Sequence, residues 1–141
     1  MEAKVLPACP VETTLTLISN KWKVLIIRDL LSGTKRFGAL KKSIGGVSQK
    51  VLTSQLRQME ENGLLTRTVF PEVPPRVEYS LTELGRSLKP VLDAMGSWGE
   101  EYRAMQTRLT GRGIPEPPDQ TACPGPESST GNTPAVKFEQ N

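Results

Sequence analysis

The polar residues between positions 49 and 57 are of the types that read DNA bases, and they recur at the spacing of one helical face. At 100° per residue, Lys50, Thr53, Ser54 and Arg57 lie on the same side of a helix that begins at Gln49. Glutamine can pair with adenine, and threonine or serine can hydrogen-bond a base or touch a thymine methyl group. We therefore expect Gln49, Lys50, Thr53 and Ser54 to reach base edges, and Arg57 to reach either a guanine or a phosphate. The alternative is an ordinary solvated helix face.

A second group that could do chemistry stands near the beginning of the chain. Cys9 directly precedes Pro10, which suits the first turn of a helix, and Glu12 is favourably placed near the positive end of that helix. A thiol at a helix N-terminus feels the same positive end, which favours the reactive thiolate. The alternative is an inert, partly buried thiol. Cys123 could resolve an oxidised Cys9, although an unreactive cysteine in a tail is the simpler interpretation.

The composition argues against an enzyme. The chain contains no histidine, which excludes histidine-dependent triads, histidine metal sites and imidazole acid–base chemistry. Two isolated cysteines without a second ligand pair do not make a zinc site. The sequence also lacks a phosphate-cradling glycine loop and a plausible carboxylate pair. We therefore expect no enzymatic activity, no metal and no cofactor.

Positive charge is concentrated in the middle of the chain, where a polyanion could bind. The net charge is only +3, but residues 35–76 hold eight basic residues against three acidic ones. Lys35, Arg36, Lys41 and Lys42 are predicted to contact phosphates, which position a protein on DNA without specifying a sequence. For each of them the alternative is a solvated basic face.

The location is expected to be cytoplasmic, without membrane contact. No apolar run approaches the ~20 residues that span a bilayer, and the N-terminus lacks the apolar core of a secretory signal. Two cysteines cannot build a disulfide framework, so a reducing compartment is the default.

Hydrophobic periodicity predicts a mostly α-helical domain with a small β-hairpin, in the order of a winged helix-turn-helix. Ser48 is a natural N-cap for the recognition helix, and Gly63 is placed to end it. The predicted helices cover residues 10–18, 22–31, 37–44, 49–62 and 82 to about 105, and the predicted strands cover 65–70 and 77–81. Pro90 should kink or restart the last helix. Residues 71–75, rich in proline, form the loop at the tip of the wing.

Two arginines of the wing have different expected roles. Arg76, next to the tip, could enter the minor groove or pair with a phosphate, and the alternative is a loop arginine pointing at water. Arg67 is expected to support the wing by pairing with Glu78 across the hairpin.

The last helix carries an apolar seam that one small core does not need. Its residues alternate at intervals of four and three over three heptads: Leu84, Leu88, Val91, Met95, Trp98, Tyr102 and Met105. A second copy of the chain is the simplest partner, and Trp22 and Trp98 are predicted to be core or interface residues instead of platforms for stacked bases. Residues 1–109 are the predicted domain, and 110–141 a disordered, Pro/Gly-rich tail.

From Cys9 to about Met105 the sequence closely resembles the HxlR-type winged helix-turn-helix transcription regulators of bacteria and archaea. The matching pieces are CPVE from Cys9, KWK at 21–23, KRF at 35–37, SQKVLTSQLRQME at 48–60, PPRVEYSLTELG at 74–85 and WG at 98–99. Each motif alone is weak, but all of them in this order are specific.

The resemblance implies a homodimer on double-stranded DNA, bound to a two-fold related operator as repressor or activator. The pairing would use the first and last helices, through Leu15, Ile18, Leu88, Val91, Met95, Trp98 and Tyr102. Some members sense electrophiles or oxidants through a cysteine directly before the first helix, and Cys9 matches that position. The competing hypothesis is a winged-helix protein-interaction module without specific DNA binding, which the basic residues Lys41, Lys42, Lys50 and Arg57 argue against.

Overall fold

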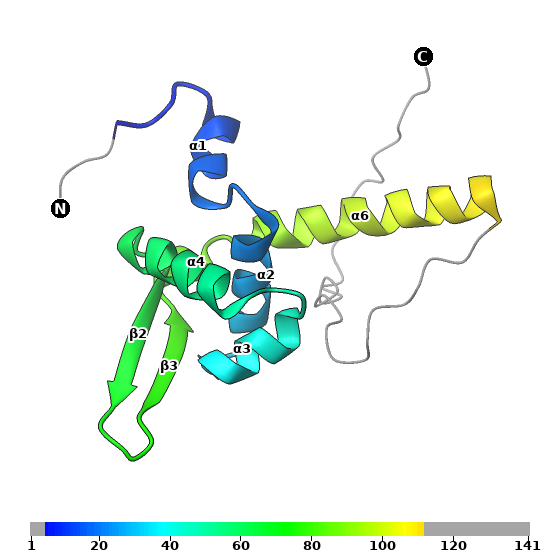
Figure 1. Cartoon of the computed structure of the whole chain (residues 1–141). Coiled ribbons are helices and arrows are strands. Elements are labelled where there is room, and N and C mark those ends of the chain that lie inside the picture. Colours follow the sequence, from blue (N-terminus) through cyan, green and yellow to red (C-terminus); the bar gives the residue numbers. More distant parts are fainter. Residues whose placement is uncertain (1–4, 112–141) are drawn as a thin grey trace, which may run out of the picture.

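The computed structural model describes residues 5–111, and it has the winged-helix architecture that the sequence predicts. The elements follow the order α1 (Pro10–Leu17), α2 (Lys21–Leu30), β1 (Lys35–Arg36), α3 (Phe37–Ile44), α4 (Gln49–Glu61), β2 (Leu65–Phe70), β3 (Arg76–Leu81), α5 (Glu83–Arg86) and α6 (Lys89–Thr110). Helices α2, α3 and α4 lie together, the β2–β3 hairpin projects from them, and α6 extends away from them as a long arm (Figure 1). Almost all of the predicted tail, together with Cys123, lies outside the described residues.

Helix α2 forms the centre of the core, as its dense apolar pattern predicts. It packs against α3, α4, β3 and α6, and Ile26 and Ile27 are completely buried. Leu40 of α3 belongs to the same core, as do Leu52, Leu56 and Met59 of α4. The hairpin adds Leu65, Tyr79 and Leu81, and Leu64 lies directly before β2. Burial of one such side chain contributes about 1.5–3 kcal/mol, so these contacts fix the orientation of the elements around α2.

Local signals set the ends of the helix-turn-helix. The Ser48 hydroxyl accepts a hydrogen bond from the Val51 amide at 3.1 Å, which confirms Ser48 as the N-cap of α4. The turn before it passes through Gly45 and Gly46 with φ of +66° and +67°, a conformation that residues with a Cβ rarely adopt. Helix α2 begins one residue earlier than expected, because the Asn20 side chain accepts from the Lys23 amide at 3.0 Å.

The sheet is larger by one short strand than the sequence predicts. Its order is β1-β3-β2, with every pair antiparallel. The hairpin pairs Leu65 with Leu81 at its base and Phe70 with Arg76 near its tip. Strand β1 aligns Lys35 with Tyr79. A strand of two residues is too short to show an alternating pattern, so hydrophobic periodicity does not predict β1.

The expected long last helix is divided in two. Helix α5 ends at Arg86, and α6 begins at Lys89 with Pro90 in its first turn, so Pro90 restarts the helix. Helix α6 runs to Thr110, further than predicted. The apolar seam is therefore not continuous from Leu84, since Leu84 belongs to a separate helix. Among residues 5–111, no helix has the apolar length to cross a membrane.

A tight joint connects the end of α4 to the beginning of α5. The Thr82 hydroxyl donates to the Gly63 carbonyl at 2.6 Å and accepts from the Gly85 amide at 3.1 Å, and the Thr82 amide donates to the Leu64 carbonyl at 3.0 Å. A Cβ on Gly85 would lie 2.1 Å from the Leu64 carbonyl oxygen. The joint therefore requires glycine at this position.

We expect Gly85→Ala to destabilise the protein by about 1–3 kcal/mol, because the added methyl group forces the backbone of residue 64 to move. The measurement is the urea unfolding midpoint, with an unchanged slope showing that only stability has changed. Gly38→Ala in α3 is the matched control, since a methyl group added to Gly38 would meet nothing within 4 Å. It should leave stability unchanged or raise it by up to about 1 kcal/mol, because a helix favours alanine over glycine. Equal midpoints for the two variants would contradict the proposed role of the joint.

Candidate nucleic-acid interface

The exposed face of α4 brings together all five residues that the sequence marks for base contact. One shallow surface depression is lined by Gln49, Lys50, Thr53, Ser54, Arg57, Gln58 and Glu61. Thr53 is half-buried and the other four predicted residues are exposed. The sequence prediction left out Gln58 and Glu61, although their spacing from Ser54 and Arg57 places them on the same face of the helix. The face is thus polar and mainly basic, with one carboxylate at its far end.

The buried side of α4 explains why this face points outward. Leu52, Leu56 and Met59 are at most 1% exposed and pack on the core around α2. Because the apolar stripe occupies one side of the helix, Lys50, Ser54 and Arg57 must occupy the other. A further contact comes from Gln55, whose side chain accepts a hydrogen bond from the Asn20 side chain at 3.0 Å.

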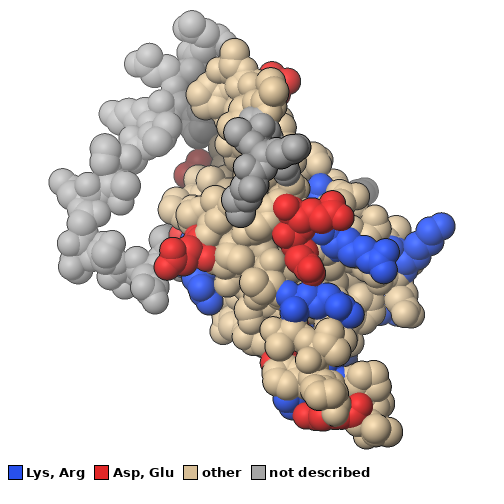
Figure 2. Space-filling model, turned by 90° about the vertical axis from the view of Figure 1, so that its left-hand side faces the viewer, with Lys and Arg blue, Asp and Glu red and all other residues tan. Residues whose placement is uncertain are grey.

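The basic residues before and along α3 lie on a neighbouring part of the surface. Lys41 and Lys42 are exposed in the last turn of α3, where the negative end of the helix dipole stabilises cations. Arg36 is exposed, whereas Lys35 is half-buried in β1. In the space-filling view, basic side chains gather toward one edge, acidic ones lie near the middle, and both charges meet at the wing tip (Figure 2).

The wing tip holds its arginine in a cluster of opposite charge. The Arg76 guanidinium lies 3.4 Å from carboxylate oxygens of both Glu72 and Glu78 and 4.1 Å from the centre of the Phe70 ring. These distances are those of ion pairs and not of short hydrogen bonds. Arg76 must therefore leave two carboxylates before it can contact a phosphate, a requirement that the sequence does not reveal.

The predicted pairing of Arg67 with Glu78 is wrong. In the register of the hairpin, Arg67 lies opposite Tyr79 and Thr68 lies opposite Glu78. Because neighbouring residues of a strand point to opposite faces, Arg67 and Glu78 project from different faces of the sheet. Glu78 pairs instead with Arg76 on its own strand.

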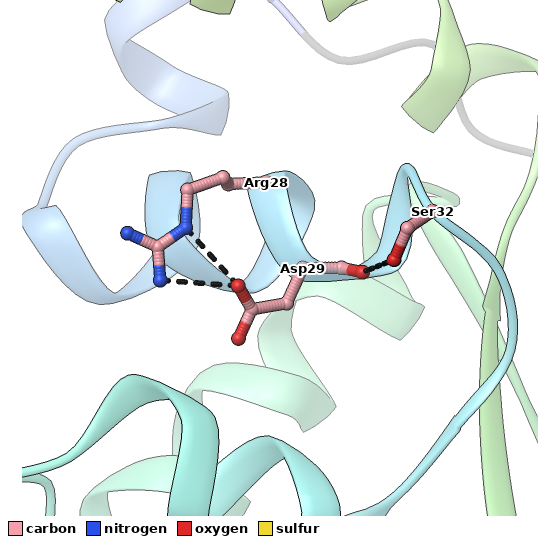
Figure 3. A network of polar contacts seen from close by, with 3 residues as sticks. All are labelled: Arg28, Asp29 and Ser32. Atoms are coloured by element: carbon pink, nitrogen blue, oxygen red, sulfur yellow. Dashed lines mark hydrogen bonds and ion pairs between the residues drawn. The ribbon is translucent and has the colours of Figure 1, made fainter. Parts of the chain in front are cut away.

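Arg28 is a basic residue of α2 that is already engaged inside the fold. Its guanidinium donates from Nε to the Asp29 carboxylate at 3.0 Å, with Nη2 also 3.0 Å from the same oxygen. Figure 3 shows this pair together with Ser32, whose hydroxyl donates to the Asp29 carbonyl at 2.9 Å near the end of α2. Asp29 is only 8% exposed, so Arg28 compensates a buried charge and is a poor candidate for binding DNA.

Cys9 lies where the sequence places it, at the N-cap of α1. Its carbonyl accepts hydrogen bonds from the amide and the hydroxyl of Thr13, at 2.9 and 3.1 Å. The thiol makes no capping bond and the residue is exposed, so the expected partial burial of the alternative is wrong. Whether the thiol is reactive or inert stays a prediction.

Exposed apolar side chains gather on α6 and α1. Trp98 is 58% exposed and stacks on Tyr102 with ring centres 5.4 Å apart. A hollow lined by Pro90, Val91, Ala94, Met95 and Trp98 continues this surface. Leu15 on α1 is also exposed. A soluble monomer rarely exposes a contiguous apolar patch of this kind without a partner for it.

Two of the residues predicted for a dimer interface belong to the chain's own core. Ile18 and Leu88 are 7% and 8% exposed, because Ile18 follows α1 into the core and Leu88 lies at the break between α5 and α6. They have little surface left for a second subunit. Of the other residues predicted for the interface, Leu15, Met95, Trp98 and Tyr102 are exposed and Val91 is half-buried. The interface itself stays a prediction.

Comparison with known proteins gives a consistent result. The family model for HxlR-like helix-turn-helix proteins matches residues 17–107. The chain is 50% identical over 95 residues to the uncharacterized HTH-type transcriptional regulator YdeP of Bacillus subtilis, which covers 67% of this chain and 74% of that protein. It is also similar to the solved structure of the redox regulator HypR in its reduced form, with 42% identity and a TM-score of 0.66 over 71% of this chain and 99% of that one.

A second solved structure supports the same assignment. The reduced form of the transcriptional regulator YodB from B. subtilis is 37% identical, with a TM-score of 0.59, over 68% of this chain and 95% of that one. The region that the family model matches contains the whole helix-turn-helix, the wing and most of α6. The chain therefore belongs to the HxlR-like helix-turn-helix family.

Proposed function

We propose that the chain is a sequence-specific regulator of transcription that binds double-stranded DNA as a homodimer and is not an enzyme. The observation that carries the proposal is the exposed face of α4, which gathers Gln49, Lys50, Ser54 and Arg57 on the second helix of a helix-turn-helix. The recognition helix of this motif enters the major groove, where such side chains distinguish base pairs. Two similar proteins, YdeP and YodB, carry the description of transcriptional regulators.

The contacts divide into two classes. Gln49, Lys50, Thr53 and Ser54 read bases, and Arg57 reaches a guanine or a phosphate. The remaining cations contact phosphates and position the protein on the duplex: Lys35, Arg36, Lys41 and Lys42. Arg76 is an additional wing contact that becomes available only when it leaves Glu72 and Glu78.

Selection of duplexes from a randomised pool, followed by affinity measurements over a range of salt concentrations, tests these two classes. Gln49→Ala should weaken binding to the selected duplex by about 1–3 kcal/mol and relax the choice of base at one position. Lys42→Ala should weaken binding to all duplexes alike and reduce the slope of log affinity against log salt by about 0.9.

Each variant is the control for the other, since one changes a base contact and the other a phosphate contact. A chain that enriches no sequence above competitor DNA would refute the proposed function. The winged-helix unit would then be a module for protein interaction.

The homodimer is supported by the exposed apolar residues of α6 and α1. Met95, Trp98 and Tyr102 are exposed along one face of α6, and the half-buried Val91 continues this face toward the core. Helix α6 extends beyond the core as an arm (Figure 1). Pairing of two such arms would remove this surface from water, and the resulting two-fold symmetry would present two copies of α4. Half-sites should then lie about one helical turn apart, ~34–36 Å.

We expect Trp98→Glu to convert the dimer to monomer, because a carboxylate would be buried at the centre of the apolar surface. Sedimentation velocity over a range of concentrations is the measurement. Glu100→Lys is the matched control, since residue 100 lies about 200° around the helix from residue 98, and it should leave the dimer intact. A wild-type chain that sediments as a monomer at all concentrations would contradict the dimer.

Regulation through Cys9 is supported by the exposure of its thiol at the beginning of α1 and by the similarity to HypR, which is described as a redox regulator. A quinone is the simplest reagent, because addition needs no second oxidant. The Cys9 thiolate forms a bond to a ring carbon as the ring C=C π bond breaks. One quinone oxygen takes the proton that the thiol released, and the other takes the hydrogen of the substituted ring carbon, so the product is a thioether-substituted hydroquinone. The bulky adduct at the start of α1 would displace the helix that approaches the second subunit.

Cys9→Ser should bind DNA as tightly as the wild-type chain but lose its sensitivity to quinone. The measurement is the affinity for the selected duplex before and after treatment, with mass spectrometry to count the adducts. Cys123→Ser is the control and should keep the full response, because the proposal assigns no role to Cys123. An equal loss of affinity in Cys9→Ser and the wild-type chain would refute Cys9 as the sensor.

A further inference from the structure

Both the oxygen and the nitrogen of the Asn20 side-chain amide make a hydrogen bond. Its oxygen accepts from the Lys23 amide at 3.0 Å and so caps α2. Its nitrogen donates to the Gln55 side-chain oxygen at 3.0 Å. The contact is partly buried, and it joins residues 35 positions apart in sequence. One side chain therefore fixes the beginning of α2 and contacts the recognition helix.

Gln55 lies at the edge of the buried stripe of α4. At 100° per residue it is 60° from Leu52 and 40° from Met59, and it points away from Lys50 and Arg57 by more than 100°. It is also outside the depression that the base-reading residues line. Gln55 is therefore placed to contact the protein and not the bases.

The apolar contacts of α4 determine which side of the helix faces the core, but they specify its fine rotation less sharply. Leu52, Leu56 and Met59 gain stability by burial, which is non-directional and tolerates small turns of the helix about its axis. A hydrogen bond between two side chains requires a narrow range of distance and angle. The contact between Asn20 and Gln55 thus supplies the directional restraint that the apolar stripe lacks.

We propose that Asn20 and Gln55 are positioning residues for base reading. Their hydrogen bond sets the rotation of α4 relative to α2, so that Gln49, Lys50, Thr53 and Ser54 enter the groove at the required angle. Neither residue touches DNA. The inference rests on the proposed function, because it concerns how that function gains its sequence preference.

The test uses the full-length chain, the duplex that the wild-type chain selects from a randomised pool, and an unrelated duplex of equal length. Gln55→Met removes the acceptor and leaves the α2 cap intact. Asn20→Ser keeps a capping oxygen but is too short to reach Gln55. Each variant should lose about tenfold in affinity for the selected duplex, and the double variant no more than either one, because all three lack the same bond.

Affinity for the unrelated duplex and the salt dependence should not change in these variants, since no charge is altered. Asn20→Asp is the conservative rescue. One carboxylate oxygen can cap α2, and the other can accept from Gln55 after its amide turns by 180°. This variant should retain the preference for the selected duplex over the unrelated one.

Ile27→Val controls for stability, because it removes a methyl group from the fully buried Ile27 without touching the contact. It should lower the unfolding midpoint and leave both affinities unchanged. Wild-type preference in Gln55→Met, an equal loss on both duplexes, or failure of Asn20→Asp to retain the preference would each overturn the inference while leaving the proposed function intact. If the wild-type chain selects no duplex, the proposed function and the inference fail together.

Discussion

The burial of α2 is the constraint on which the rest of the structure depends. Ile26 and Ile27 are completely enclosed, and α3, α4, β3 and α6 all pack against this helix. Because apolar side chains cover several sides of α2, each neighbour must direct its own apolar stripe inward and its polar residues outward. The recognition face of α4 is thus a consequence of how the core is filled.

Directional bonds then refine the position that burial defines. Asn20 restrains helix α4 near its middle, through the hydrogen bond to Gln55. Thr82 restrains it just beyond its end, through the hydrogen bond to the Gly63 carbonyl. The first contact comes from the junction between α1 and α2, and the second from the beginning of α5. The first junction continues into α1 and the second leads through α5 to α6. The recognition helix is therefore in contact with the segments that connect it to both helices of the proposed dimer interface.

Local sequence signals predicted most of the fold, and the errors arise where distant residues decide the outcome. Ser48 and the β-branched residues of β2 identified their elements, because helix caps and strand propensity act over a few residues. Strand β1 and the bond between Asn20 and Gln55 depend on neighbours that are remote in sequence. The failed pairing of Arg67 with Glu78 depends on strand register. Leu88 is buried in the chain's own core, which the seam pattern did not indicate. Periodicity shows that a residue is apolar but not whether its own core or a second subunit covers it.

The distribution of charge limits how the wing can contribute to DNA binding. Within residues 65–81, Arg67 and Arg76 are balanced by Glu72 and Glu78, and the two carboxylates already engage Arg76. Attraction to phosphates must then come mainly from the exposed cations of α3 and α4, which no described acidic side chain pairs with in the structure. The Arg76 ion pairs are only partly exposed, but both are long at 3.4 Å, so a phosphate can compete for Arg76 once the helices have brought the wing to the duplex. In the proposed complex with DNA, the helices would therefore supply the long-range attraction, and the wing would add its contact after Arg76 has left its carboxylates.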